Sequence, residues 1–118
     1  MLLRNFLFHR VSEDQDALWP PMTPFLFEKT IGTLVRKYEI VNLESFLQKE
    51  NTPTFSRPVA TILFDDGYKD NIEYAAPILK KYSCTASFYV VTDCINRDIP
   101  TWTYLVDYAF QRTKNETI

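Results

Sequence analysis

The sequence predicts an α/β fold in which parallel strands alternate with helices, as an open sheet or as part of a barrel. The apolar run at 59–64 is typical of a strand covered on both faces. The amphipathic pattern from Thr23 to about Tyr38 predicts a helix that lies against a sheet, with Thr23 as its cap and Pro24 in its first turn. Strand and helix segments then alternate four times, which favours a parallel layout.

The other elements follow from local composition and caps. Short apolar and β-branched runs predict further strands at 6–8, 40–41 and 85–91, and helices are predicted from Asn42 through Leu47, from Asp70 or Asn71 to Lys81, and at 102–111. Asp70 or Asn71 is expected to cap the third helix, and Pro77 to kink it or mark its beginning. Asp93 is expected to be a turn residue only. Trp19 is expected to pack on the core, although its ring could also line a groove for a sugar face.

Composition bounds the class of protein. The 118 residues can bury one core, so residues 1–118 are expected to form a single domain or part of one. Thirteen basic and fifteen acidic residues form no block, which disfavours nucleic acid and anionic membranes as partners. The apolar start is too short for a signal peptide or a membrane span, so a cytoplasmic location is expected. Cys84 and Cys94 are expected to be reduced thiols.

The stretch Asp65-Asp66-Gly67-Tyr68 is the most informative part of the chain. It follows the apolar strand, at the end where α/β proteins bind ligands. Two adjacent carboxylates repel each other, and a cation would remove this conflict, with one carboxylate as a ligand and the other as a base. Gly67 permits a turn with positive φ. An ordinary turn after a strand is the alternative interpretation.

His9 also follows a predicted strand. It is the single histidine of the chain, and a lone histidine is more often structural than catalytic. His9 and Tyr68 are candidates for binding substrate or for holding the two carboxylates in place through contacts with them.

The run Leu63-Phe64-Asp65-Asp66-Gly67 resembles the Thr-Phe-Asp-Asp-Gly motif of polysaccharide deacetylases of the NodB-homology type. Residues 7–11 are similar to the family's opening Tyr-His-Arg-Val, and residues 75–82 and 86–91 are similar to its next helix and strand. The likeness covers roughly Phe6 to Trp102. The chain thus resembles the amino-terminal portion of such a catalytic domain.

This resemblance implies hydrolysis of N- or O-acetyl groups on a polysaccharide or oligosaccharide, on a deformed (β/α) barrel with a divalent metal, often zinc. It implies that Asp65 is the general base and that Asp66 is a metal ligand. The family's His-Ser/Thr-x-x-His pair and its later motifs are missing here, and Leu63 replaces the threonine of the first motif. The chain is therefore expected to be a fragment or a truncated gene product that binds metal poorly.

Two alternatives stay open. One is a non-catalytic carbohydrate-binding or interaction module on the same fold. The other is a magnesium-dependent phosphoacceptor signalling domain, which also gathers carboxylates at strand ends but normally places its acid pair after the first strand. Because four strands cannot close a barrel, self-association through exposed sheet edges is also expected.

Overall fold

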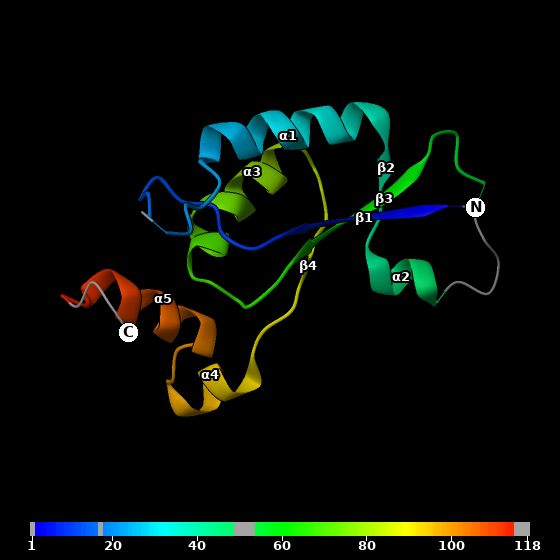
Figure 1. Cartoon of the computed structure of the whole chain (residues 1–118). Coiled ribbons are helices and arrows are strands. Elements are labelled where there is room, and N and C mark those ends of the chain that lie inside the picture. Colours follow the sequence, from blue (N-terminus) through cyan, green and yellow to red (C-terminus); the bar gives the residue numbers. More distant parts are fainter. Residues whose placement is uncertain (1, 17, 49–53, 115–118) are drawn as a thin grey trace.

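The computed structural model describes residues 2–16, 18–48 and 54–114. Figure 1 shows its elements in chain order: β1 (Leu3–Phe8), α1 (Pro24–Lys37), β2 (Glu39–Ile40), α2 (Leu43–Leu47), β3 (Val59–Phe64), the π-helical turn η1 (Asn71–Ala75), α3 (Ala76–Lys81), β4 (Ser87–Phe88), α4 (Thr92–Arg97) and α5 (Trp102–Arg112). This alternation confirms the predicted α/β class. No helix in the described ranges is long and apolar enough to cross a membrane.

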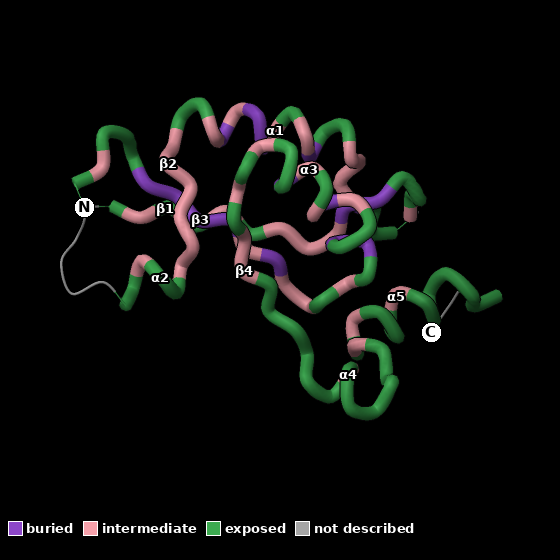
Figure 2. Tube along the Cα trace, turned by 180° about the vertical axis from the view of Figure 1, so that it is seen from behind, coloured by how far each residue is buried: buried purple, intermediate pink, exposed green. Residues whose placement is uncertain are grey.

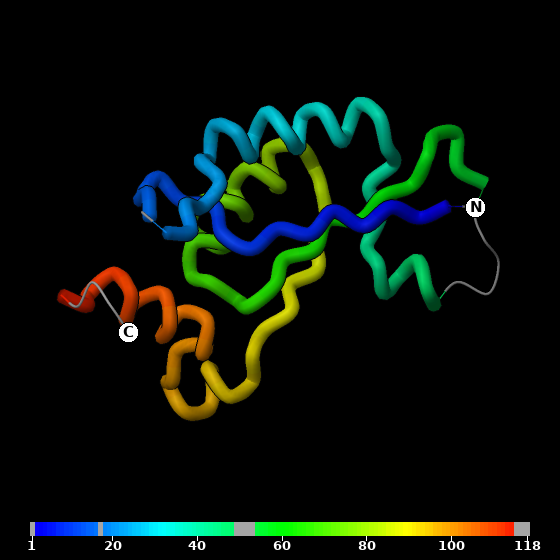
Figure 3. Tube along the Cα trace, viewed as in Figure 1, coloured from blue at the N-terminus to red at the C-terminus, as the bar shows by residue number. Residues whose placement is uncertain are grey.

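The strand β3 lies at the centre of a parallel sheet. Its neighbour β1 runs beside it over its whole length, from Leu3 opposite Val59 to Phe8 opposite Phe64 (Figure 3). The other edge of β3 is shared, because β2 pairs with its first two residues and β4 with its last two. The apolar strand is therefore interior, as its composition predicts, and the short or partly polar strands lie outside it.

One hydrophobic core joins β3 to the helices α1 and α3. The helix α1 begins after Thr23, whose Oγ1 accepts a hydrogen bond from the Leu26 backbone at 3.3 Å. Phe64 is fully buried, and its ring centroid lies 5.6 Å from that of Phe8 and 5.8 Å from that of Phe27. The remaining buried members of this core are Val11, Ile31, Leu34, Ile62, Ala75 and Leu79. The core thus holds the carboxyl end of β3 in a rigid setting.

The carboxyl-terminal part of the chain extends away from this core. Figure 2 shows buried residues in the sheet, α1 and α3, whereas the helices α4 and α5 contain none. The accessible surface of 8596 Å2 exceeds the roughly 6,700 Å2 of a compact monomer of 13.9 kDa. The radius of gyration of 17.1 Å likewise exceeds the roughly 13 Å of a compact domain of this length. Self-association through these surfaces stays a prediction.

Four expectations about local structure need correction. β1 begins at Leu3 rather than Phe6, because β3 pairs with all six of its residues and Asn5 Oδ1 accepts a hydrogen bond from Thr61 Oγ1 at 2.7 Å. β4 is only two residues long, because β3 ends opposite Phe88. Asp93 is a helical residue of α4, not a turn residue. Trp19 does not pack on the core, since 46% of it is exposed.

The third predicted helix begins with a π-helical turn and lacks the expected side-chain cap. Asp70 makes no capping hydrogen bond, and Asn71–Ala75 is a wider π-helical turn in which the Ala76 N–H donates to the Asn71 carbonyl. Pro77 has no N–H to donate, and it occupies the first turn of α3. Pro77 therefore marks the beginning of the α-helical part, as one of the two predicted possibilities stated.

Candidate functional site

The two adjacent carboxylates lie on a tight turn at the carboxyl end of β3. The Asp65 N–H donates to the Phe8 carbonyl at 3.1 Å, which continues the pairing with β1 by one residue. Asp65 Oδ1 then accepts from the Asp66 N–H at 3.0 Å. Asp66 and Gly67 both have left-handed backbone, with φ of 68° and 71°. The sheet therefore fixes the backbone of Asp65, and the left-handed turn sets the direction of Asp66.

Gly67 is required both for its conformation and for space. A Cβ atom at this position would lie 2.8 Å from Val90 Cγ1, in addition to the strain of positive φ. We expect Gly67→Ala to lower the free energy of unfolding by about 1–3 kcal/mol in urea titrations followed by circular dichroism.

Gly32→Ala is the matched control for this prediction. Gly32 is buried in the helix α1, where a Cβ would meet the tip of the Tyr82 side chain at 3.2 Å. That side chain can shift, and alanine favours a helix by about 1 kcal/mol over glycine. Equal destabilisation by the two substitutions would contradict the requirement for glycine in the site turn.

Asp70 and Asn71 tie the end of β1 to the segment that follows the site turn. Asp70 Oδ2 accepts from Arg10 Nε at 3.0 Å, and its Oδ1 accepts from the Val11 N–H at 3.4 Å. Asn71 Nδ2 donates to the His9 carbonyl at 2.8 Å. Asp70 and Asn71 are both buried, so these hydrogen bonds lie largely away from water. They hold the segment that carries His9 beside the turn that carries the carboxylates.

Tyr68 is half-buried next to this connection. The Arg10 guanidinium lies over its ring, 5.3 Å from the centroid. Burial raises the pKa of the Tyr68 phenol, the nearby Thr101 side chain opposes this shift, and the negative charge of Asp66 adds to it. Its hydroxyl therefore stays protonated at neutral pH and can donate a hydrogen bond.

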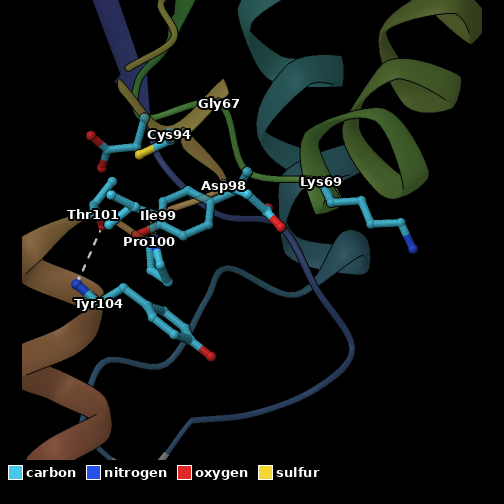
Figure 4. Close-up of a pocket in the computed structure, with 10 residues that line it drawn as sticks. Gly67, Lys69, Cys94, Asp98, Ile99, Pro100, Thr101 and Tyr104 are labelled. Atoms are coloured by element: carbon cyan, nitrogen blue, oxygen red, sulfur yellow. Dashed lines mark hydrogen bonds between the residues drawn. The ribbon is translucent and has the colours of Figure 1, made fainter. Parts of the chain in front are cut away.

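Two adjoining pockets open beside the carboxylates. The larger one has a volume of about 550 Å3, and its lining includes Asp65, Asp66 and His9. The second, of about 430 Å3, is lined by Tyr68 and Asp66 among others. Figure 4 shows this second pocket, with Lys69 on one side and Thr101 and Tyr104 on the other. Asp65, Asp66 and His9 thus share one pocket, and Tyr68 lines the adjoining pocket together with Asp66.

Sequence reasoning missed the contribution of α4 and α5 to the walls. Asp93, Cys94, Thr101 and Trp102 also line the larger pocket. The Thr101 side chain caps α5 by accepting from the Tyr104 backbone N–H at 3.3 Å, and a threonine directly before a helical run is a signal that the sequence offers. Cys84 and Cys94 are free and half-buried. Burial raises the pKa of the Cys84 thiol.

The donors in the described ranges do not fit a catalytic metal by themselves. Such a zinc ion usually takes three protein ligands. No group of three or more His, Cys, Asp or Glu side chains among the described residues is placed to hold a metal ion. Asp66 could supply one carboxylate ligand, and further ligands would have to come from elsewhere.

Comparisons with known proteins show the family of this chain. The family model described as polysaccharide deacetylase matches residues 52–113, which is more than half of the chain. The chain belongs to the polysaccharide deacetylase family. This confirms the resemblance inferred from the motifs, and it gives the phosphoacceptor interpretation no support. A search of curated proteins finds no match.

Solved structures show the fold. A de-N-acetylase from Aggregatibacter actinomycetemcomitans superposes with a TM-score of 0.68 at 21% identity, covering 85% of this chain and 43% of its own. The deacetylase PplD of Streptococcus pyogenes, solved in complex with acetate, gives a TM-score of 0.66 at 20% identity, covering 92% of this chain and 52% of its own. The predicted partial barrel is confirmed. The chain spans about half the length of these structures.

Proposed function

We propose that residues 1–118 form the amino-terminal portion of a catalytic domain that removes N- or O-acetyl groups from a polysaccharide or oligosaccharide. The observation that supports this best is that Asp65, Asp66 and His9 line one pocket at the carboxyl end of β3, in a chain of the polysaccharide deacetylase family. The proposal extends the family assignment to the particular residues that do the chemistry.

Asp65 is the general base in this proposal. One of its oxygens accepts from the Asp66 N–H, and Oδ2 has no hydrogen-bond partner among the described residues. Oδ2 can therefore take a proton from water as that water attacks the acetyl carbonyl. A bond forms between the water oxygen and the carbonyl carbon, the bond from that carbon to the sugar nitrogen or oxygen breaks, and acetate is released. The amine or hydroxyl of the sugar takes up a proton from a general acid, a role that we assign to none of the described residues.

Asp66 is proposed as one ligand of a divalent metal, zinc by the resemblance, which would polarise the acetyl carbonyl when bound. Tyr68 and His9 are proposed to bind substrate or to support the carboxylates. The Tyr68 phenol can donate a hydrogen bond to a sugar or acetyl oxygen. Because the described residues leave the ligand set incomplete, we propose that this chain alone binds metal poorly.

Acetate release from a hexamer of N-acetylglucosamine tests the proposed function. The intact mass of the native gene product is measured first, since a mass about twice 13.9 kDa would indicate a chain as long as the solved deacetylases. We expect a gene product of that length to release acetate, and the 118-residue chain to release none and to keep no stoichiometric zinc after dialysis. Binding of the hexamer by the longer product without acetate release, even with added zinc, would favour the non-catalytic binding module.

A further inference from the structure

Both tryptophans of the chain line the same pocket as the two carboxylates. Tryptophan is usually largely buried in folded proteins. Here Trp19 is 46% exposed and Trp102 is 74% exposed, whereas Phe27 and Phe64 are fully buried in the core. Two large aromatic surfaces are thus in contact with water beside Asp65 and Asp66, where a ligand can reach them.

Local hydrogen bonds define the backbone that carries both tryptophans. Asp16 Oδ1 accepts from the backbone N–H groups of Leu18 at 3.0 Å and Trp19 at 3.4 Å, which defines the turn before the first ring. That ring lies beside the His9 ring, with centroids 5.8 Å apart. Trp102 is the first residue of α5, directly after the capping residue Thr101. The two tryptophans are thus placed independently of each other at the level of local structure.

A long-range hydrogen bond connects the elements that carry them. Gln111 Nε2, on α5, donates to Asp16 Oδ1 at 2.7 Å, across 95 positions of sequence. Hydrogen bonds from the Leu18 backbone and from Gln111 lower the pKa of the Asp16 carboxyl. Asp16 therefore accepts these bonds as a carboxylate at neutral pH and joins the segment of Trp19 to the helix of Trp102.

The chemistry of the pocket fits a carbohydrate. A pyranose ring has apolar C–H faces, which pack on an indole, and hydroxyl groups around its rim, which bind carboxylates and hydroxyls. The larger pocket has both kinds of wall, since Asp93, Thr101 and Thr103 line it with the two indoles. Its volume of about 550 Å3 lies within the roughly 300–1,000 Å3 of ligand pockets. An apolar peptide would leave these carboxylates without partners.

We propose that Trp19 and Trp102 are two stacking platforms for successive sugar rings of a glycan, which hold an acetylated residue against Asp65. Asp16 and Gln111 are positioning residues for these platforms. This inference rests on the proposed function for the nature of the ligand, and it assigns specificity to two residues outside the motifs that define the family resemblance.

Intrinsic fluorescence of the 118-residue chain tests the platforms. Because there are two tryptophans, Trp19→Phe and Trp102→Phe each leave one reporter. On titration with N-acetylglucosamine hexamer, the emission of both reporters is expected to change with saturation. In calorimetry, Trp19→Ala and Trp102→Ala are each expected to weaken binding about tenfold, the phenylalanine variants less, and Gln111→Leu by a smaller factor.

Phe110→Ala is the matched control, because Phe110 is an exposed aromatic residue of α5 that does not line the larger pocket. Its affinity should equal that of the wild type, and far-ultraviolet circular dichroism checks that every variant is folded. Absence of hexamer binding by the wild type, or binding unchanged in both alanine variants, would overturn the proposal. The hexamer and its fully deacetylated counterpart could bind equally well while the alanine variants lose affinity for both. That result would support the stacking platforms and contradict recognition of the acetyl group. Acetate release together with unchanged affinity in the alanine variants would support the proposed deacetylase function and contradict the role of the two tryptophans.

Discussion

Asp65→Asn is expected to lower kcat by about 10²- to 10⁴-fold in a form of the domain that carries a complete metal site. Asparagine has the same shape as aspartate, and its Oδ1 can still accept from the Asp66 N–H, so the turn should persist. It cannot take the proton of the attacking water. Metal content should stay near that of the wild type, because a base acts in the transition state and need not hold the ion in the ground state. Acetate release and metal analysis are measured on the same preparation.

Variants of two further carboxylates in the same pocket are compared with Asp65→Asn. Asp66→Asn should lower metal content as well as turnover, since it removes the proposed ligand. Asp93→Asn should leave metal content near that of the wild type, because Asp93 is exposed and pairs with Arg97, at 3.8 Å on the same helix. Equal loss of metal in the Asp65 and Asp66 variants would contradict the division of roles between them.

Asp70→Ala is expected to lower the free energy of unfolding by about 2–4 kcal/mol. The Asp70 side chain is 10% exposed and that of Arg10 is 24% exposed, so the change leaves a largely buried guanidinium without its 3.0 Å partner. It also removes the acceptor of the Val11 N–H. Urea titration followed by circular dichroism measures the effect. Because this connection places His9 beside the carboxylates, weaker glycan binding should accompany the loss of stability.

A surface ion pair provides the control for Asp70→Ala. Lys69 and Glu73 are 2.6 Å apart in the next turn of the chain, but their side chains are 86% and 46% exposed. Glu73→Ala should therefore change the free energy of unfolding by less than about 1 kcal/mol. In the double variant of Arg10 and Asp70 to alanine, the loss should be smaller than the sum of the single losses. A fully additive result would show that the pair does not couple β1 to the site.

Local pattern predicted much of the fold from the sequence. The strand at 59–64 and the helix after Thr23 have the predicted bounds within a residue or so, because a continuous apolar run and a capped amphipathic repeat are determined by neighbours in sequence. Asp65 and Asp66 were found for the same reason, as polar residues directly after that strand. The Asn42 cap of α2, whose side chain accepts from the Ser45 N–H at 3.0 Å, was also readable locally.

Other features depend on contacts between distant parts of the chain. Aspartate is a common helix cap, yet the Asp70 side chain accepts from Arg10, 60 positions away, and makes no capping hydrogen bond. A largely buried guanidinium without a carboxylate partner would be costly. Trp19 was expected in the core, since a large aromatic ring normally gains most by burial. It is exposed instead, on a segment that Asp16 joins to α5 through Gln111 across 95 positions. The sequence by itself therefore determined the strand, the helix and the acid pair, whereas the tertiary structure decided which distant side chains surround that pair.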